Sequence, residues 1–323
     1  MTDHPSSPHI AVIGAGAWGI ALACASARAG ARVTLWSRSP VPAGCRNLPR
    51  LPAVTLPDSI EVTSELPEDA DLTLLVVPMQ TLRQIAPRLR GHSPLIACCK
   101  GLELGTGDLP LDILQQTQPD RPHAVLSGPN FAIEVAMEAP AAATIAAPSL
   151  DDAHRYVEQL SSPSFRLYAS DDPIGVQIAG AAKNVVAIGA GIAIGAGLGE
   201  NARAALITRA IVEIGRLAAA MDGRPATISG LSGLGDLILT CTGAGSRNYS
   251  LGLELGRGTS LAEILATRST VAEGVATAPA LAERAKALGI AMPITETVSA
   301  FLAGEIDLAQ ARRFLLERPI TVE

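Results

Sequence analysis

The sequence predicts an α/β protein in two parts, a doubly wound sheet followed by a mostly α-helical second domain. Three observations support this prediction. Short apolar runs alternate with helical patterns over residues 9–170, such runs nearly vanish after residue 172, and a glycine-rich turn follows the first run. The chain has 323 residues, enough for two domains of roughly 100–200 residues each. We therefore place a dinucleotide-binding domain over residues 1–172 and a helical substrate and catalytic domain over residues 173–323.

The first unit of the predicted sheet has the pattern of a dinucleotide-binding turn. Residues 9–13 predict a buried strand, residues 20–29 a helix and residues 32–36 a second strand. Between the first strand and the helix stands a GxGxxG pattern, formed by Gly14, Gly16 and Gly19. These glycines allow a tight turn, a close approach of the backbone to a pyrophosphate, and packing of helix on strand. The pattern predicts a Rossmann-type site; the alternative is a glycine-rich turn that binds no nucleotide.

The end of the second predicted strand indicates the type of nicotinamide cofactor. An NAD site usually carries Asp or Glu there for the ribose 2′-hydroxyl, whereas a nearby arginine accommodates the 2′-phosphate of NADP. Here the chain reads Leu35-Trp-Ser-Arg38, without an acid. Arg38 therefore favours NADP(H), with NAD(H) as the second cofactor that could bind. The alternative is an ordinary surface arginine.

The rest of the first domain alternates strands and helices. Strands are predicted at residues 71–77, 94–99, 124–126, 141–146 and 165–169, and helices at 80–89 and 151–160. The carboxyl ends of such strands face the cofactor crevice. Lys100 follows one of these strands, and a Ser-Gly-Pro-Asn turn with Gly128 and Asn130 follows another. Residues 39–59 carry five prolines and are interpreted as a loop.

The second domain is interpreted as a series of helices. They are predicted at residues 173–195, 201–221, 225–231, 246–256, 260–266, 276–288, 293–303 and 307–316. Asp171 or Asp172 suits the N-cap of the first helix, and Pro173 suits its first position. This helix carries no charge before Lys183, and the next charge is Glu200. A lone lysine in so apolar a helix either extends to solvent or has a function. We predict that Lys183 meets a substrate where the two halves come together.

Composition excludes several classes of function. The net charge of −6 argues against a general nucleic-acid binder, which would show a basic stripe, but not against small anionic ligands. The five cysteines form no CxxC pair, so we expect no disulfide framework, no metal site and a reducing compartment. The first nine residues lack the apolar core of a signal peptide. The charge-free run after Lys183 is shorter than the ~20 residues of a membrane span. These features predict a soluble cytoplasmic protein without stable membrane insertion.

Four groups of the second half could carry chemistry. They are Lys183, Asp236 among glycines and aliphatic residues, the run Ser246-Arg247-Asn248, and the short acidic turn with Val271 and Glu273. Reduction of a ketone by hydride needs a proton donor, and a lysine in an apolar site beside a carboxylate can act as one. A substrate phosphate needs arginine and backbone N–H groups, which Ser-Arg-Asn at a helix start offers. Structural alternatives are an extended lysine, a capping aspartate, a surface arginine and a solvated glutamate.

Together these residues resemble bacterial NAD(P)-dependent glycerol-3-phosphate dehydrogenase over residues 9–316. The matching segments are Val12-Ile-Gly-Ala-Gly-Ala-Trp-Gly19, Cys99-Lys-Gly-Leu102, Leu126-Ser-Gly-Pro129 with Phe131-Ala132, Ala182-Lys-Asn-Val-Val-Ala-Ile188, Gly233-Leu-Gly-Asp236 with Leu239-Thr-Cys-Thr242, Ser246-Arg-Asn248 and Val271-Ala-Glu-Gly274. The combination is specific, although no single segment is.

The resemblance implies reversible reduction of dihydroxyacetone phosphate to sn-glycerol 3-phosphate, which supplies phospholipid synthesis. It implies that Lys183 is the catalytic proton donor and acceptor, with Asp236 as a carboxylate of the substrate site. The implied cofactor contacts are Ala17, Trp18, Arg38, Lys100, Ala132, Arg247, Val271 and Glu273. The implied substrate contacts are Lys100, Gly128, Asn130, Lys183, Asp236, Ser246, Arg247 and Asn248. A homodimer is compatible with the family, but no pattern in these residues indicates one.

Three positions depart from the family pattern. Asn130 stands where Ser or Thr is expected, Ala182 where Leu is usual, and Gln177-Ile178 where an acid is often found. None of these departures removes a charged catalytic group. Two other hypotheses stay open. One is a two-domain dehydrogenase of hydroxy acids, which would need no phosphate clamp. The other is a non-catalytic dinucleotide sensor, which would need no proton donor.

Overall fold

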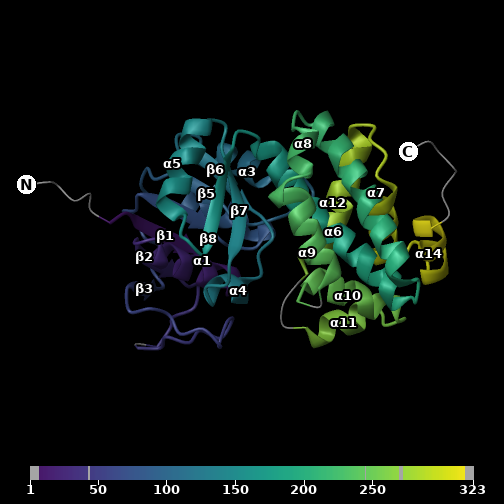
Figure 1. Ribbon diagram of the computed structural model, residues 1–323, viewed down its shortest axis with the longest axis horizontal. Helices are drawn as coiled ribbons and strands as arrows, with labels where there is room; N and C mark the ends of the chain where they lie inside the picture. Colours follow the sequence, from purple (N-terminus) through teal and green to yellow (C-terminus); the bar gives the residue numbers. More distant parts are fainter. Residues whose placement is uncertain (1–6, 43, 244, 269–271, 317–323) are drawn as a thin grey trace, which may run out of the picture. The chain divides into compact units, whose positions relative to one another are not determined.

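The chain forms two compact units (Figure 1). The computed structural model describes residues 7–42, 44–243, 245–268 and 272–316. The first unit comprises the chain up to Cys99 together with Pro110–Pro173, and the second comprises Lys100–Leu109 and the chain from Ile174 onward. The sequence analysis assigned residues 100–109 to the first domain, whereas in the structure they pack with the second unit.

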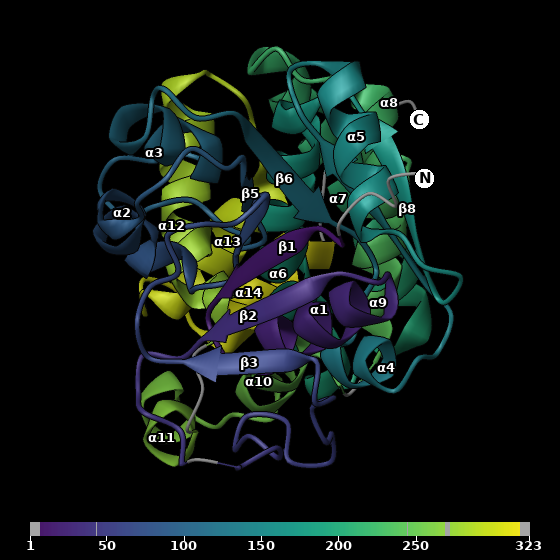
Figure 2. The ribbon, with the colours of Figure 1, turned by 90° about the vertical axis from the view of Figure 1, so that its left-hand side faces the viewer.

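The first unit is built on one eight-stranded sheet with the order β3-β2-β1-β4-β5-β6-β7-β8 (Figure 2). Its strands are β1 (His9–Ile13), β2 (Arg32–Trp36), β3 (Ile60–Thr63), β4 (Leu72–Leu75), β5 (Leu95–Ala97), β6 (His123–Ser127), β7 (Ala141–Ala146) and β8 (Phe165–Ser170). All neighbouring strands pair in parallel except β6 and β7, which are antiparallel. The strand order reverses between β1 and β4, which is the point where such sheets bind their ligands. The predicted doubly wound sheet is confirmed.

Both faces of this sheet are covered, because successive residues of a strand point to opposite sides. On β1, Ile10 and Val12 join a core cluster with residues of α1 (Ala17–Arg28) and α5 (Leu150–Leu160). Ala11 and Ile13 join another cluster with residues of α2 (Leu82–Ile85) and α3 (Pro110–Thr117). Figure 2 shows these helices on the two sides of the strands. The apolar β-branched runs of the sequence are therefore central strands buried on both faces.

Local elements differ from the prediction at several places. The predicted helix over residues 80–89 is divided into η1 (Met79–Thr81), α2 and η2 (Ala86–Arg88). Pro87 lies in the last of these turns and has no N–H to continue a regular helix. The strand β3 and the helices α3 and α4 (Ala132–Ala136) were not predicted. Both β3 and α4 are very short, with four residues in β3 and five in α4, so their sequences carry no more than two periods of any pattern.

The second unit is helical, as predicted. Its helices are α6 (Pro173–Gly195), α7 (Gly199–Ala220), α8 (Pro225–Ile228), α9 (Asp236–Thr242), α10 (Arg247–Gly256), α11 (Leu261–Thr267), α12 (Glu273–Ala287), α13 (Pro293–Leu302) and α14 (Leu308–Leu316), and the π-helical turn η3 (Leu231–Gly235) precedes α9. Side-chain caps begin α10, α11 and α14; at α14, Asp307 Oδ1 accepts a hydrogen bond from Gln310 N at 2.8 Å. Ser246 accepts a hydrogen bond from Tyr249 N at the start of α10, and Ser260 forms a capping box with Glu263 at α11.

Helix α6 is the centre of the second unit. Its residues share one core cluster with residues of α7, α9, α10, α12 and α13. Figure 1 shows α7, α9, α10 and α12 around it. A Cβ at Gly252 of α10 would overlap the carbonyl oxygen of Ile188 of α6, so glycine is required where these two backbones touch. By length and composition α6 could cross a membrane, but 89% of that stretch is buried inside the folded chain. It is the core helix of a globular unit.

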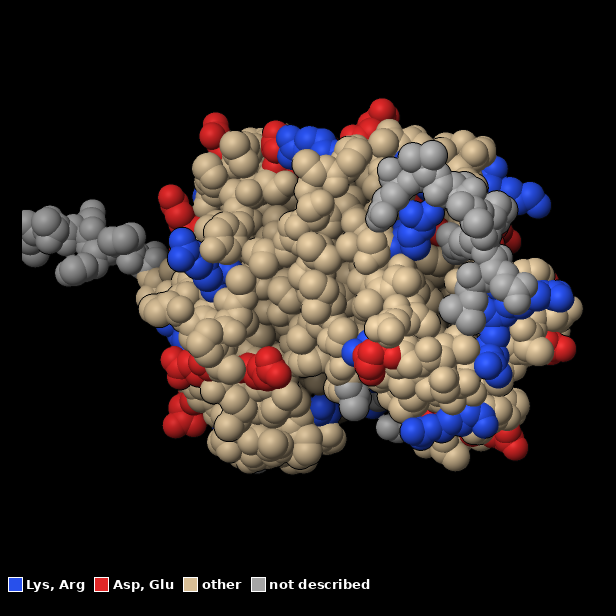
Figure 3. All heavy atoms as spheres, turned by 45° about the vertical axis from the view of Figure 1, so that its right-hand side comes forward, with Lys and Arg blue, Asp and Glu red and all other residues tan. Residues whose placement is uncertain are grey.

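Charged side chains do not gather into one large field on the face drawn in Figure 3. Lysine and arginine lie there in small groups, with aspartate and glutamate between them and wide uncharged areas around them. This distribution agrees with the modest net charge of −6 and with a ligand small enough to be bound by local groups.

Candidate functional site

The glycine turn of the first unit leaves its helix N-terminus open to a ligand. Gly14 has φ +124°, a conformation that side chains oppose, and a Cβ at Gly19 would overlap the carbonyl oxygen of Gly14. At Gly16, by contrast, an added Cβ would meet no atom within 4 Å. Gly16 is the N-cap of α1 and offers no side-chain cap, so the first N–H groups, at Ala17 and Trp18, are not capped by it. This turn fits a pyrophosphate bound through backbone N–H groups.

Arg38 follows β2 at the carboxyl edge of the sheet. Its side chain is exposed, and the neighbouring Ser37 Oγ donates a hydrogen bond to Ser39 O at 2.8 Å. Trp36 Nε1 donates to Ser64 O at 3.1 Å, which fixes the end of β2 beside the end of β3. The arginine is thus held on an ordered strand end with its guanidinium in solvent, where a phosphate could reach it.

The turn after β6 contains the other predicted positions of the first unit. A Cβ at Gly128 would lie 2.7 Å from Ala143 Cα, so the backbone passes close to β7 at this point. Asn130 Nδ2 donates a hydrogen bond to Ala142 O at 3.2 Å, while its Oδ1 is buried without a hydrogen-bond partner among the described residues. Ala132 is the first residue of α4 and is half-buried. The amide of Asn130 is therefore oriented by the sheet through its nitrogen.

Two lysines share one carboxylate in the second unit. Lys100 Nζ lies 2.5 Å from Asp236 Oδ2, and Lys183 Nζ lies 2.5 Å from Asp236 Oδ1. Asp236 is 1% exposed and Lys183 is 8% exposed. Lys183 comes from the middle of α6 and Asp236 from the first turn of α9. The sequence left two alternatives for Lys183, extension to solvent or a function. In the structure its side chain is buried and paired with Asp236.

The same cluster contains a residue that the sequence analysis did not single out. Lys183 Nζ donates a hydrogen bond to Thr240 Oγ1 at 3.0 Å, and Thr240 Oγ1 in turn donates to Asp236 Oδ1 at 3.2 Å. Thr240 lies four residues after Asp236, one turn along α9, so both side chains face the same way. That spacing is the sequence signal that could have indicated it. We call Lys100, Lys183, Asp236 and Thr240 the lysine–aspartate cluster.

Burial changes the acid–base properties of this cluster. Desolvation lowers the pKa of Lys183 to about 8, and Asp236 only partly offsets this because Lys100 adds a second positive charge. Burial alone would raise the pKa of Asp236, but the two ammonium groups together hold it below its ordinary value. Asp236 therefore stays ionised, and Lys183 can gain or lose a proton near neutral pH.

The choice of lysine at these positions is itself informative. The sequence contains 25 lysines and arginines, of which only Lys100, Lys183 and Lys286 are lysine. Two of these three contact the same carboxylate. Arginine cannot lose its proton in a protein, whereas a buried lysine can. The cluster is thus built from the kind of cation that can act both as an acid and as a base.

A chain of amides links three helices beside the cluster. Asn248 Nδ2 donates a hydrogen bond to Asn184 Oδ1 at 2.9 Å, and Asn248 Oδ1 accepts one from Gly274 N at 3.0 Å. Asn184 follows Lys183 on α6, Asn248 lies on α10, and Gly274 lies in the first turn of α12. The amides therefore fix the α10 start against the helix that carries Lys183.

The remaining predicted residues of the second unit occupy helix starts. Ser246 is the buried N-cap of α10, and Arg247, exposed, is its first residue. Glu273 is the first residue of α12 and half-buried, rather than part of a free acidic turn. Val271 lies outside the described residues. Negative groups are favoured at helix N-termini, so α10 offers a place for a phosphate.

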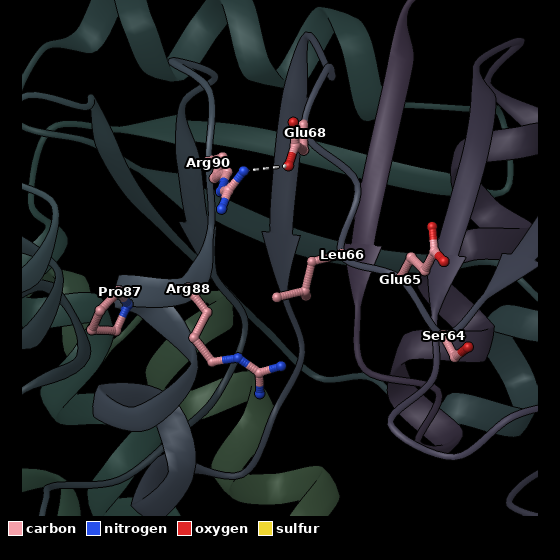
Figure 4. Close-up of a pocket in the computed structure, with 7 residues that line it drawn as sticks. All are labelled: Ser64, Glu65, Leu66, Glu68, Pro87, Arg88 and Arg90. Atoms are coloured by element: carbon pink, nitrogen blue, oxygen red, sulfur yellow. Dashed lines mark hydrogen bonds and ion pairs between the residues drawn. The ribbon is translucent and has the colours of Figure 1, made fainter.

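A groove of about 610 Å³ lies in the first unit (Figure 4). It is lined by Ser64, Glu65, Leu66, Glu68, Pro87, Arg88 and Arg90. Figure 4 shows Arg90 directed at Glu68, and the two are 3.3 Å apart. Both side chains are mostly exposed, so this ion pair contributes little to stability. None of the predicted site residues lines the groove, and we assign no function to it.

Comparisons with known proteins agree along the whole chain. The sequence profile described as "NAD-dependent glycerol-3-phosphate dehydrogenase N-terminus" matches residues 9–153, and the corresponding "C-terminus" profile matches residues 172–313. The chain is 61% identical over 320 residues to "Glycerol-3-phosphate dehydrogenase [NAD(P)+]" of Gluconobacter oxydans, covering 98% of this chain and 99% of that one. It is 52% identical to the protein of the same name from Acidiphilium cryptum, with complete coverage of both.

A solved structure shows the same arrangement of elements. Crystalline glycerol-3-phosphate dehydrogenase from Coxiella burnetii superimposes with a TM-score of 0.91 at 36% identity, covering 97% of this chain and 99% of that chain. The matched region includes the sheet of the first unit and the helices of the second.

Proposed function

Because this chain belongs to the family of NAD-dependent glycerol-3-phosphate dehydrogenases, we propose that it catalyses the reversible, NAD(P)H-dependent reduction of dihydroxyacetone phosphate to sn-glycerol 3-phosphate. The product would supply glycerophospholipid synthesis. The observation that carries the proposal is the buried lysine–aspartate cluster, in which Lys183 and Lys100 each lie 2.5 Å from Asp236. Such a cluster provides the acid and base that a carbonyl reduction needs.

The first unit would hold the cofactor. The open position at Gly16 and the uncapped start of α1 suit its pyrophosphate, with Gly14 and Gly19 giving the turn its shape. When bound, the nicotinamide supplies the hydride that reduces the ketone carbon. Arg38, on the ordered end of β2, would bind a 2′-phosphate, which makes NADP(H) the preferred cofactor and NAD(H) the weaker one. Ala132, at the start of α4, is the other contact expected from this unit.

Lys183 would hold and move the proton. In reduction its ammonium donates a proton to the oxygen that becomes the alcohol, and in oxidation the neutral amine takes that proton back. A pKa of about 8 allows both forms near neutral pH. Asp236 keeps the amine in place through one carboxylate oxygen, and Thr240 holds it from a second direction. Lys100, on the other carboxylate oxygen, would bind the substrate oxygen electrostatically.

The phosphate end of the substrate would bind at the start of α10. Ser246, Arg247 and Asn248 combine a hydroxyl, a guanidinium and a helix N-terminus, which is the chemistry that recognises a phosphate. Asn248 is also fixed by Asn184, the neighbour of Lys183. The phosphate would therefore be held at a set position relative to the catalytic amine. Gly128 and Asn130 would add contacts from the turn after β6.

Initial rates of nicotinamide oxidation with dihydroxyacetone phosphate test this function directly. NADPH and NADH are compared side by side, in the wild type and in Arg38→Ala. We expect turnover with both cofactors, a preference for NADPH, and loss of most of that preference in the variant. Cofactor binding without turnover on any phosphoketone would favour a sensor instead. Turnover of simple 2-keto acids, unaffected by added glycerol phosphate, would favour a hydroxy-acid dehydrogenase.

We also infer a cytoplasmic location and a homodimer. All five cysteines are free, which suits a reducing compartment. The dimer rests on the family resemblance, and size-exclusion chromatography with light scattering measures it. A mass of one chain, 33.2 kDa, at micromolar concentration would contradict the dimer.

A further inference from the structure

Residues 100–109, which we call the strap, leave the first unit and pack with the second. The chain enters the strap two residues after the end of β5 and returns to the first unit at α3. Lys100 is its first residue. We propose that the strap holds Lys100 in the lysine–aspartate cluster, with Leu102 as the positioning residue. The proposal rests on the proposed function for the role of Lys100, but the position of that lysine can be tested without turnover.

The strap is anchored by its apolar residues. Leu102 is 1% exposed and Leu109 is 3% exposed, and both belong to the core cluster of the second unit. That cluster also contains Leu237, the residue after Asp236, and Ala182, the residue before Lys183. The same packed core therefore fixes the backbone beside all three charged residues. A buried leucine two residues after Lys100 limits where the lysine backbone can move.

The strap is a folded turn, not an extended crossing. Glu103 N donates a hydrogen bond to Asp108 O at 3.0 Å, and Gly107 N donates to Glu103 O at 3.0 Å. Thr106 Oγ1 adds a bond of 2.7 Å to the Glu103 carboxylate. These contacts close the loop between the two leucine anchors. Lys100 stands immediately before Gly101, whose φ of +136° turns the chain out of the strand direction.

This construction has a consequence for the chemistry. Lysine carries its ammonium on a long flexible side chain. The position of its ion pair therefore depends on how firmly the backbone is held. Because the strap fastens Lys100 to the core that carries Asp236 and Lys183, the three charges move as one body. Sequence order assigns Lys100 to the nucleotide-binding half, yet the strap makes it a member of the substrate half. Its positive charge then always acts on Lys183.

The test is NMR of protein labelled with ¹³C at the lysine ε-carbons. The chain has three lysines, so the spectrum has three ε-carbon environments, and single substitutions assign them. We compare the titration of Lys183 in wild type, Leu102→Ala, Lys100→Met and the double variant. Leu104→Ala is the matched control, because Leu104 belongs to the same strap but is 49% exposed. Lys286 is exposed and serves as an internal reference.

We expect the pKa of Lys183 to rise in Leu102→Ala, because Lys100 then no longer holds its positive charge beside Lys183. Lys100→Met should also raise the pKa of Lys183, and adding Leu102→Ala to Lys100→Met should not change that pKa further. Leu104→Ala should leave it unchanged. In steady-state assays, Leu102→Ala should raise the KM for dihydroxyacetone phosphate about tenfold, the loss of one charge-assisted hydrogen bond.

Three results would overturn the proposal. One is an unchanged Lys183 titration in a folded Leu102→Ala protein. Another is that Leu102→Ala shifts the pKa of Lys183 equally in the wild-type and the Lys100→Met backgrounds, which would mean that the substitution loosens the core in general. The third is the same effect from Leu104→Ala. If Leu102→Ala does not fold, Leu102→Val is used, with a smaller shift expected by the same criteria. Absence of wild-type turnover would count against the proposed function alone, since the NMR comparison does not depend on it.

Discussion

The two units offer a ligand opposite kinds of chemistry. The turn around Gly14, Gly16 and Gly19 presents backbone without side chains. At Gly14 and Gly19 there is no room for a side chain, and at Gly16 there is open space that a ligand could fill. The lysine–aspartate cluster of the second unit presents buried charge, with two ammonium groups on one carboxylate. Under the proposed function, the first arrangement would recognise a constant part of a cofactor by shape. The second would move a proton, which requires groups whose pKa can be shifted by burial.

This difference means that the units should fail differently when they are altered. Damage to the glycine turn should weaken cofactor binding and leave the proton chemistry intact. Damage to the cluster should do the reverse. The following predictions use that contrast, from the largest expected effect to the smallest.

Replacement of the catalytic amine should have the largest effect. Lys183→Met keeps the apolar stem and removes the proton donor, so kcat should fall on the order of 10³-fold, the range typical of a lost general acid. NADPH affinity, measured by fluorescence titration, should stay near that of the wild type. The matched control is Lys286→Met, at an exposed lysine, which should keep full activity. A variant of Lys183 with turnover close to wild type would break the comparison.

The glycine turn should show the complementary loss. Gly16→Ala places a methyl group in open space, so thermal stability should be unchanged while NADPH affinity falls. Gly19→Ala places one against Gly14 O, so both stability and NADPH affinity should fall. We expect affinity losses on the order of 10–100-fold, the equivalent of roughly 1–3 kcal/mol of strain. Calorimetric melting and cofactor titration separate the two variants. Unweakened binding in Gly16→Ala would mean that the pyrophosphate is not bound at this turn.

The pH dependence should sharpen the contrast. Lys183 must be protonated to donate, so kcat/KM for ketone reduction should fall about tenfold per pH unit above pH 8, as the pKa of about 8 is passed. Oxidation of glycerol phosphate needs the neutral amine, so its kcat/KM should rise about tenfold per pH unit below pH 8 and level off above it. Cofactor affinity, which relies on backbone N–H groups, should be flat there. Parallel pH profiles in the two directions would remove Lys183 from the role of acid and base.

Thr240 should give the smallest effect. Thr240→Val is close in shape and removes one hydrogen bond to Lys183 Nζ and one to Asp236. We expect kcat to fall by roughly tenfold, near the lower end of the about 1.5–3 kcal/mol that a hydrogen bond to a charged group contributes. Thr242→Val is the control, because Thr242 lies on the same helix and donates only to the backbone at Ile238 O among the described hydrogen bonds. An equal fall in kcat in Thr240→Val and Thr242→Val would mean that Thr240 has only a structural role.

The elements predicted well are those whose signals are local. Helix α6 begins at Pro173 and β7 spans residues 141–146, as the sequence indicated, because a proline start and an apolar run each lie within a few neighbouring residues. Helix α12 begins at Glu273, three residues before the predicted start at 276, since its first turn carries no clear cap. The strand β3 was missed because four residues at the edge of a sheet depend on pairing with β2.

The sequence by itself determined the glycine turn, the alternation of strands and helices, the helical second half and the resemblance to a dehydrogenase family. Backbone geometry and hydrophobic period act between residues a few positions apart, so they can be read along the chain. Only the tertiary structure decided that Lys100 belongs with the second unit, that Thr240 joins the cluster, and that two lysines share Asp236. The partners in those contacts lie far apart in the sequence: Lys183 and Asp236 are separated by 53 positions, and Lys100 and Asp236 by 136. The energies of these contacts depend on desolvation and mutual charge, which exist only once the chain is packed.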